Sequence, residues 1–104
     1  MALDFLMISD GGEILRRVGV SLDVHGQLFG RIDRSRYPQL GRIHDYYEDV
    51  MYERDDLNQL IKDLRTVRPL CEEFGRWHVG LVDELLSLAE LARSESKRID
   101  VVAD

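Results

Sequence analysis

The first 20 residues contain apolar runs of the length of β-strands, separated by a turn signal. Residues 2–8 are apolar at every position except Asp4, and the glycines of Asp10-Gly11-Gly12 can adopt the positive φ angles of a tight turn. This pattern predicts a first strand. Residues 13–20 fit either its hairpin partner or a short helix, because a run this short matches both periods.

Apolar residues then recur at helical spacing in four segments. Ser21 can cap the first helix, which would end before the polar residues 33–36. Pro38 suits the first turn of a second helix over residues 38–51. The last part of that helix is ambiguous, since residues 50–53 also fit a short extended segment.

The two remaining helical segments have the strongest amphipathic pattern. A helix from Asp56, with Gln59 three residues later as in a capping box, carries the apolar stripe Leu57, Leu60, Ile61, Leu64 and Val67. Pro69 suits the start of a further helix, bent or broken near Gly75 or Gly80. The positions predicted to face inward on it are Leu70, Phe74, Trp77, Leu81, Leu85 and Leu88.

The β-branched stretch over residues 99–103 predicts a final strand. Together these elements predict an α+β or α/β fold, in which about four helices cover a small sheet of two to four short strands. The N-terminal and C-terminal strands both belong to that sheet. We expect one domain over residues 1–104, since domains commonly hold about 100–150 residues.

Charge and cysteine content restrict the partners and the compartment. The chain has 20 acidic and 14 basic side chains, a net charge of −6. Affinity for nucleic acid depends on cationic groups that neutralise phosphates, so we expect a basic protein partner and no nucleic acid. Cys71, the only cysteine, excludes an internal disulfide and fits a reducing compartment. Without a basic leader or about 20 consecutive apolar residues, the sequence predicts a cytoplasmic protein that does not enter membranes.

Residues 44–56 depart furthest from what stability alone requires. They hold six of the 20 carboxylates and three of the four tyrosines, but only one cation, Arg54. On a helix ending near residue 51, Asp45 would lie beside Glu48 and Asp49, and such like-charge pairs each cost about 0.2–0.5 kcal/mol. Their position near the C-terminal end also opposes the helix dipole. Local helix stability therefore does not explain these acids.

Two interpretations of this acidic segment remain. It is either a solvated surface, neutralised by nearby arginines, or a partner-binding surface. In the second case the carboxylates steer a basic protein into place and the tyrosines anchor it. The candidate residues for such a surface are Asp45, Tyr46, Glu48, Asp49, Tyr52, Glu53 and Asp56.

Part of this segment resembles barstar-like bacterial immunity proteins, which neutralise nuclease toxins. The paired tyrosines Tyr46-Tyr47 precede acids and then a leucine-rich helix, and residues 88–102 are similar in passing from a helix to a β-branched strand. These stretches cover about a third of the chain, and Glu48-Asp49-Val50 replaces the glycine and asparagine that follow the tyrosines in barstar. The resemblance implies that a toxin's basic active site is blocked by Tyr46, Glu48, Asp49, Glu53 and Asp56.

The sequence carries no motif for catalysis or for a cofactor. His44 and Glu48 have a spacing that zinc sites use, but their only nearby third ligands are Asp45 or Asp49, and we expect no metal site. The spacing of Cys71 and His78 fits core packing better than a nucleophile and its base. We therefore expect a non-enzymatic interaction protein without catalytic residues, cofactor or metal.

The arginines of the N-terminal half have two interpretations, solubility with pairing inside the chain or self-association. These arginines are Arg16, Arg17, Arg31, Arg34 and Arg36. In self-association the basic half of one chain would meet the acidic face of another. Under this alternative the protein is a homodimer with a structural or regulatory role.

Overall fold

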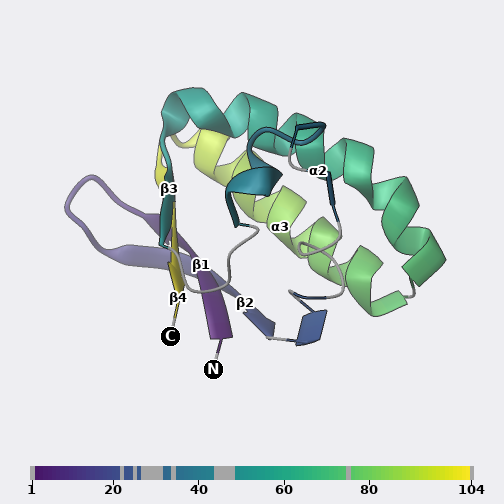
Figure 1. The fold of residues 1–104 in the computed structure, drawn as a ribbon. Helices are drawn as coiled ribbons and strands as arrows, with labels where there is room; N and C mark the ends of the chain where they lie inside the picture. The colour runs from purple at the N-terminus through teal and green to yellow at the C-terminus, as the bar shows by residue number, and fades with distance from the viewer. Residues whose placement is uncertain are drawn as a thin grey trace.

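An antiparallel four-stranded sheet and two long α-helices account for most of the part of the chain that the computed structural model describes (Figure 1). The described residues are 2–21, 23–24, 26, 32–33, 35–43, 49–74 and 76–103. Their elements are β1 (Ala2–Ile8), β2 (Ile14–Ser21), the 3-10 helix η1 (Leu40–Ile43), β3 (Val50–Tyr52), α2 (Arg54–Phe74), α3 (Arg76–Ser94) and β4 (Arg98–Ala103).

The α+β class is confirmed, and so is the presence of both terminal strands in one sheet. The strand order is β2-β1-β4-β3, with every neighbouring pair antiparallel. The prediction of about four covering helices was too high, since the described residues form two long α-helices, and besides these only Asp23, Val24 and Gly26 are α-helical. The helix predicted from Ser21 falls largely outside the described residues, although the Val24 N–H donates to Ser21 Oγ at 3.4 Å, as an N-cap requires.

Residues 13–20 lie almost entirely in strand β2, which settles the ambiguity left by their short apolar run. The turn before β2 is closed by two backbone bonds, from the Gly12 N–H to the Ser9 carbonyl and from the Ser9 N–H to the Glu13 carbonyl, each 2.9 Å long. Gly12 has a φ of 85°, which a residue with a side chain rarely adopts. The hairpin β1–β2 is therefore fixed by its turn chemistry, with a register irregularity between Met7 and Ile8.

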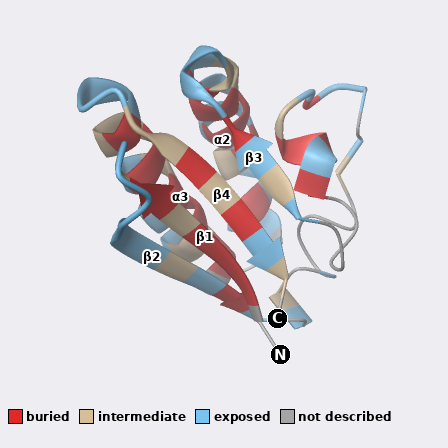
Figure 2. Ribbon diagram, turned by 90° about the vertical axis from the view of Figure 1, so that its left-hand side faces the viewer, coloured by how far each residue is buried: buried red, intermediate tan, exposed pale blue. Residues whose placement is uncertain are grey.

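The hydrophobic core lies between one face of the sheet and the two helices. Alternate residues of β1 and β4 point into it, and Figure 2 shows them as buried segments along both strands. The strands contribute Leu3, Phe5, Met7, Val20, Tyr52, Ile99 and Val101, and the helices contribute Leu57, Leu60, Ile61, Leu64, Val67, Cys71, Val82, Leu85, Leu88, Ala89 and Ala92.

Helices α2 and α3 form an antiparallel pair held by polar contacts along its length. Arg65 Nη2 lies 2.7 Å from Glu90 Oε1, and Arg68 Nε lies 2.7 Å from Asp83 Oδ1. The hydrogen bond from Arg68 lowers the pKa of Asp83. From Arg65 to Arg68 along α2 the partner moves back along α3 from Glu90 to Asp83, as in an antiparallel pair. The two helices cover the sheet as one layer (Figure 1).

The predicted helix boundary at Pro69 is wrong. Helix α2 continues through Pro69 to Phe74, and α3 begins at Arg76, so the separation lies near Gly75 and not at Gly80. Proline removes one helical hydrogen bond and costs about 3 kcal/mol in a helix interior. The buried residues Val67 and Cys71 on either side of it outweigh that cost. Leu70, predicted to face inward, is consequently 38% exposed.

The predicted helix over residues 38–51 is also wrong in its described parts. Residues 40–43 form a single 3-10 turn, and residues 50–52 form β3, paired with β4. This outcome matches the alternative extended segment at 50–53. A three-residue edge strand is too short to show a period, so the pairing with β4, which is distant in the sequence, decides its structure.

Candidate functional site

No described helix lies on the sheet face opposite α2 and α3 (Figure 1), and the side chains of this face are mixed. Two ion pairs lie on it: Arg17 with Asp4 at 3.1 Å and Arg98 with Asp100 at 3.2 Å. Met51 of β3 and Val102 of β4 point to the same side and are 44% and 37% exposed. This face therefore offers both charge and apolar area for contact.

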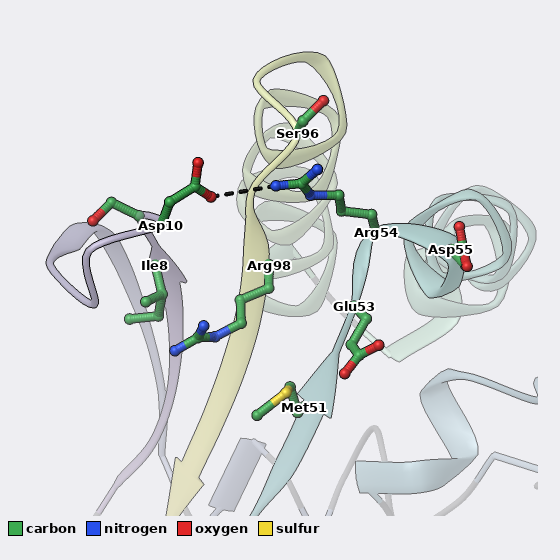
Figure 3. Close-up of a pocket in the computed structure, with 9 residues that line it drawn as sticks. Ile8, Asp10, Met51, Glu53, Arg54, Asp55, Ser96 and Arg98 are labelled. Carbon is green, nitrogen blue, oxygen red and sulfur yellow. Dashed lines mark hydrogen bonds and ion pairs between the residues drawn. The ribbon is translucent and has the colours of Figure 1, made fainter.

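A hollow of about 360 Å³ lies at one end of this face (Figure 3). The hairpin turn, the ends of three strands, the start of α2 and the turn before β4 meet around it. Its lining residues are Ile8, Ser9, Asp10, Met51, Glu53, Arg54, Asp55, Ser96 and Arg98.

Charged side chains form the rim of this hollow. Asp10 bridges two cations, with Arg54 Nη2 at 3.3 Å from Oδ1 and Lys97 Nζ at 3.5 Å from Oδ2. In Figure 3 Asp10 and Arg54 reach toward each other across the top of the hollow. Glu53 and Asp55 are exposed, and within the described residues their carboxylates form no ion pair. These two carboxylates are exposed rim groups that no described cation neutralises.

The seven residues predicted to bind a partner differ in whether the structure describes them and in how exposed they are. Asp45, Tyr46 and Glu48 lie outside the described residues, so their part in a surface stays a prediction. Glu53 is exposed on the rim of the hollow. Asp49 is exposed too, but its Oδ1 accepts the Ala103 N–H at 2.9 Å, which joins the ends of β3 and β4.

Tyr52 does not lie on the surface, contrary to the expectation that it anchors a partner. Its side chain is fully buried, because the alternation of β3 turns it toward the helices, opposite Ile99. The hydroxyl donates to the Gln39 carbonyl, and the Arg42 guanidinium lies 5.0 Å from the ring centre. Burial raises the pKa of Tyr52. This tyrosine holds the η1 region against β3.

Asp56 has a local structural role. Its Oδ2 accepts the Glu53 N–H at 3.1 Å, and the Asp56 N–H donates to the Glu53 carbonyl at 2.9 Å. Asp56 is therefore the third residue of the helix, and its side chain accepts the backbone N–H of the N-cap residue Glu53, as in a capping box. The predicted capping box began at Asp56, whereas the helix begins two residues earlier, at Arg54. Arg42 Nη1 at 3.4 Å partly neutralises this carboxylate.

Sequence reasoning missed the buried carboxylate that holds the η1 region. Asp63 Oδ2 accepts the backbone N–H groups of Gln39 and Leu40, at 2.8 and 3.2 Å, and Oδ1 accepts Gln59 Nε2 at 2.8 Å. Asp63 is only 2% exposed. A signal was present, because Asp63 stands between the core residues Ile61 and Leu64, where a lone acid needs a partner.

Within the described residues, no group of three or more His, Cys, Asp or Glu side chains could hold a metal ion. Cys71 and His78 are both buried, and burial raises the pKa of the Cys71 thiol to about 11. None of the described helices is long and apolar enough to cross a membrane.

Comparisons of the chain with protein-family models, with curated proteins and with solved structures find no match. The resemblance to barstar-like immunity proteins therefore stays a prediction.

Proposed function

We propose that this chain is a non-enzymatic protein-interaction domain that binds a basic partner at the rim of the hollow beside β3. The observation that carries this proposal is the pair of exposed carboxylates, Glu53 and Asp55, beside the exposed apolar side chain of Met51. Carboxylates on such a rim attract a cationic surface and speed its association. Met51 supplies an adaptable apolar contact.

The hollow is shaped by contacts within the chain that leave these acids available. Asp10 holds Arg54 and Asp100 holds Arg98, so both guanidinium groups of the lining have partners of their own. A lysine or arginine of a second protein would meet Glu53 and Asp55.

The more specific form of this proposal is an immunity protein or inhibitor that occludes the basic active site of a nuclease toxin, acting in the cytoplasm of a bacterium. It rests on the paired tyrosines and acids of residues 46–49 and on the net charge of −6. Such a domain acts by covering its partner and needs no catalytic group of its own.

Charge reversal on the rim tests the proposal. The wild type, Glu53→Lys and the control Glu73→Lys are used as baits at low salt in a lysate of the source organism, and each captured protein is then purified for titration. Glu73 is an exposed acid at the other end of α2, so both variants change the net charge equally. We expect the wild type and Glu73→Lys to bind one basic protein, and Glu53→Lys to bind it at least about tenfold more weakly.

The proposal fails if Glu53→Lys and Glu73→Lys bind the captured protein equally well. The inhibitor role fails separately if the captured protein is a nuclease whose activity is unchanged by a saturating amount of the wild type.

A further inference from the structure

Strand β2 is an edge strand with little protection. The sheet order places β1 on one side of it, and no described strand lies on the other. Residues 14–17 are exposed, including Ile14 at 61% and Leu15 at 41%. Exposed edge strands pair readily with further strands unless proline, a bulge or a covering element prevents it. The eight residues of β2 provide room for a long pairing.

A groove of about 470 Å³ runs between β2 and α3, on the helix side of this edge. Its floor is apolar, formed by Val18, Leu88 and Leu91. Arg16 lines the strand wall, whereas Asp83 and Glu84 line the helix wall. Arg17 borders the groove too, but its side chain pairs with Asp4 on the other face of the sheet. A strand added to β2 would lay alternate side chains into this groove. A segment bound in the groove would complement the helix wall if it placed a cation near Asp83 and Glu84.

The direction of α3 relative to β2 determines which helix residue lies at the same height along the groove as each strand residue. Ile14 pairs with Ile8, and Ile8 also pairs with Arg98, the first residue after the turn that ends α3. Helix α3 therefore runs opposite to β2, with Leu91 near Arg16. Two strand residues span about 6.6 Å, which corresponds to about four helix residues. On this scale Val18 lies about level with Ser87 and Leu88, and Val20 lies about level with Asp83 and Glu84.

We propose that β2 pairs antiparallel with β2 of a second copy of this chain, about a two-fold axis at Val18. The sheets of the two copies then join into one, and their α3 helices lie on the same face, because opposed residues point to the same side of a sheet. Val18 faces Val18, and Arg16 of one copy faces Val20 of the other. Arg16 thereby reaches the level of Glu84 of the other copy, and the contact occurs twice.

The position of the axis follows from charge and strand length. An axis at Arg17 would oppose two arginines directly, which is unfavourable. An axis at Gly19 would pair only residues 17–21 of each strand. The axis at Val18 pairs residues 15–21 and places Arg17 opposite Gly19. Asp83 already binds Arg68, at 2.7 Å, so Glu84 is the carboxylate that receives Arg16.

Charge exchange across the interface tests the contact. By sedimentation equilibrium we expect the wild type to dimerise, and Arg16→Glu and Glu84→Arg each to dimerise at least about tenfold more weakly. A mixture of the two variants should regain the wild-type affinity. In the mixed dimer the two substituted side chains meet as an acid and a base, and the native Arg16–Glu84 contact is kept at the symmetric position. This recovery also shows that both variants are folded.

Cysteine cross-linking tests the register. Opposed Cα atoms in an antiparallel pair lie about 4.5–5.5 Å apart, which a disulfide can span. Oxidised Val18→Cys should therefore give a covalent dimer. The control Ser21→Cys should not, since the two residues at position 21 lie about 20 Å apart in this register. A wild type that stays monomeric at high concentration overturns the proposal and leaves the groove to another occupant. Equal dimerisation of all variants, or equal cross-linking at both positions, overturns this interface.

Discussion

At the residue scale, Asp63 shows how one buried acid fixes a segment that has little regular structure. Replacing it with alanine leaves the backbone N–H groups of Gln39 and Leu40 without their acceptor, and an unsatisfied buried donor costs about 1–3 kcal/mol. We expect Asp63→Ala to lower the free energy of unfolding by about 2–4 kcal/mol, measured by urea denaturation. The exposed control Glu73→Ala should change it by less than about 0.5 kcal/mol. Similar midpoints for the two variants would show that η1 does not depend on this carboxylate.

Cys71 gives a prediction for alkaline pH. Burial raises the pKa of its thiol from 9.0 to about 11, so the folded protein keeps this proton to higher pH than the unfolded chain does. The associated stability is complete below pH 9 and is lost as the pH rises toward 11, an amount of roughly 2 kcal/mol. Between about pH 8 and 11 the wild type should therefore lose more stability than Cys71→Ala in urea titrations, while the other titrating groups act alike in both. Parallel pH profiles would contradict this.

At the element scale, helix α2 contains an interior proline, Pro69, on its exposed face. Pro69 and Arg65 are both exposed, so the Arg65 carbonyl, which lacks a helical donor at position 69, faces solvent. We expect Pro69→Ala to restore that hydrogen bond and to raise the free energy of unfolding by about 1–3 kcal/mol, seen as a higher urea midpoint. A lower midpoint would mean that the proline shapes the helix to seat Val67 and Cys71.

The elements also show what the sequence could predict. The apolar periods identified the strands at both termini and the stripe of α2, because packing preserves those periods along each element. They could not identify β3, whose three residues become a strand only beside β4. The same limit applies to the hollow. Glu53 was predicted, but Ile8, Asp10 and Arg98 join it only through the sheet order.

At the scale of the whole molecule, the two proposed surfaces lie at opposite edges of one sheet. Strand β3, beside the acidic rim, is one edge strand, and β2 is the other. A dimer through β2 would leave both rims exposed and could bind two copies of a basic partner. Binding to a partner that is itself oligomeric would then gain from the linkage of the two sites.

This separation predicts that variants at the two edges affect different equilibria. Glu53→Lys should weaken partner binding without changing the dimer, whereas Arg16→Glu should disrupt the dimer without changing the affinity for a monomeric partner. If the rim steers its partner by charge, as proposed, the association rate of the partner should fall steeply between about 50 and 300 mM salt, where the screening length shortens, while the dissociation rate changes little. Stopped-flow kinetics and sedimentation measure the two equilibria independently. If Arg16→Glu abolished partner binding as well, the partner would contact both copies, and the acidic rim alone would not be its site.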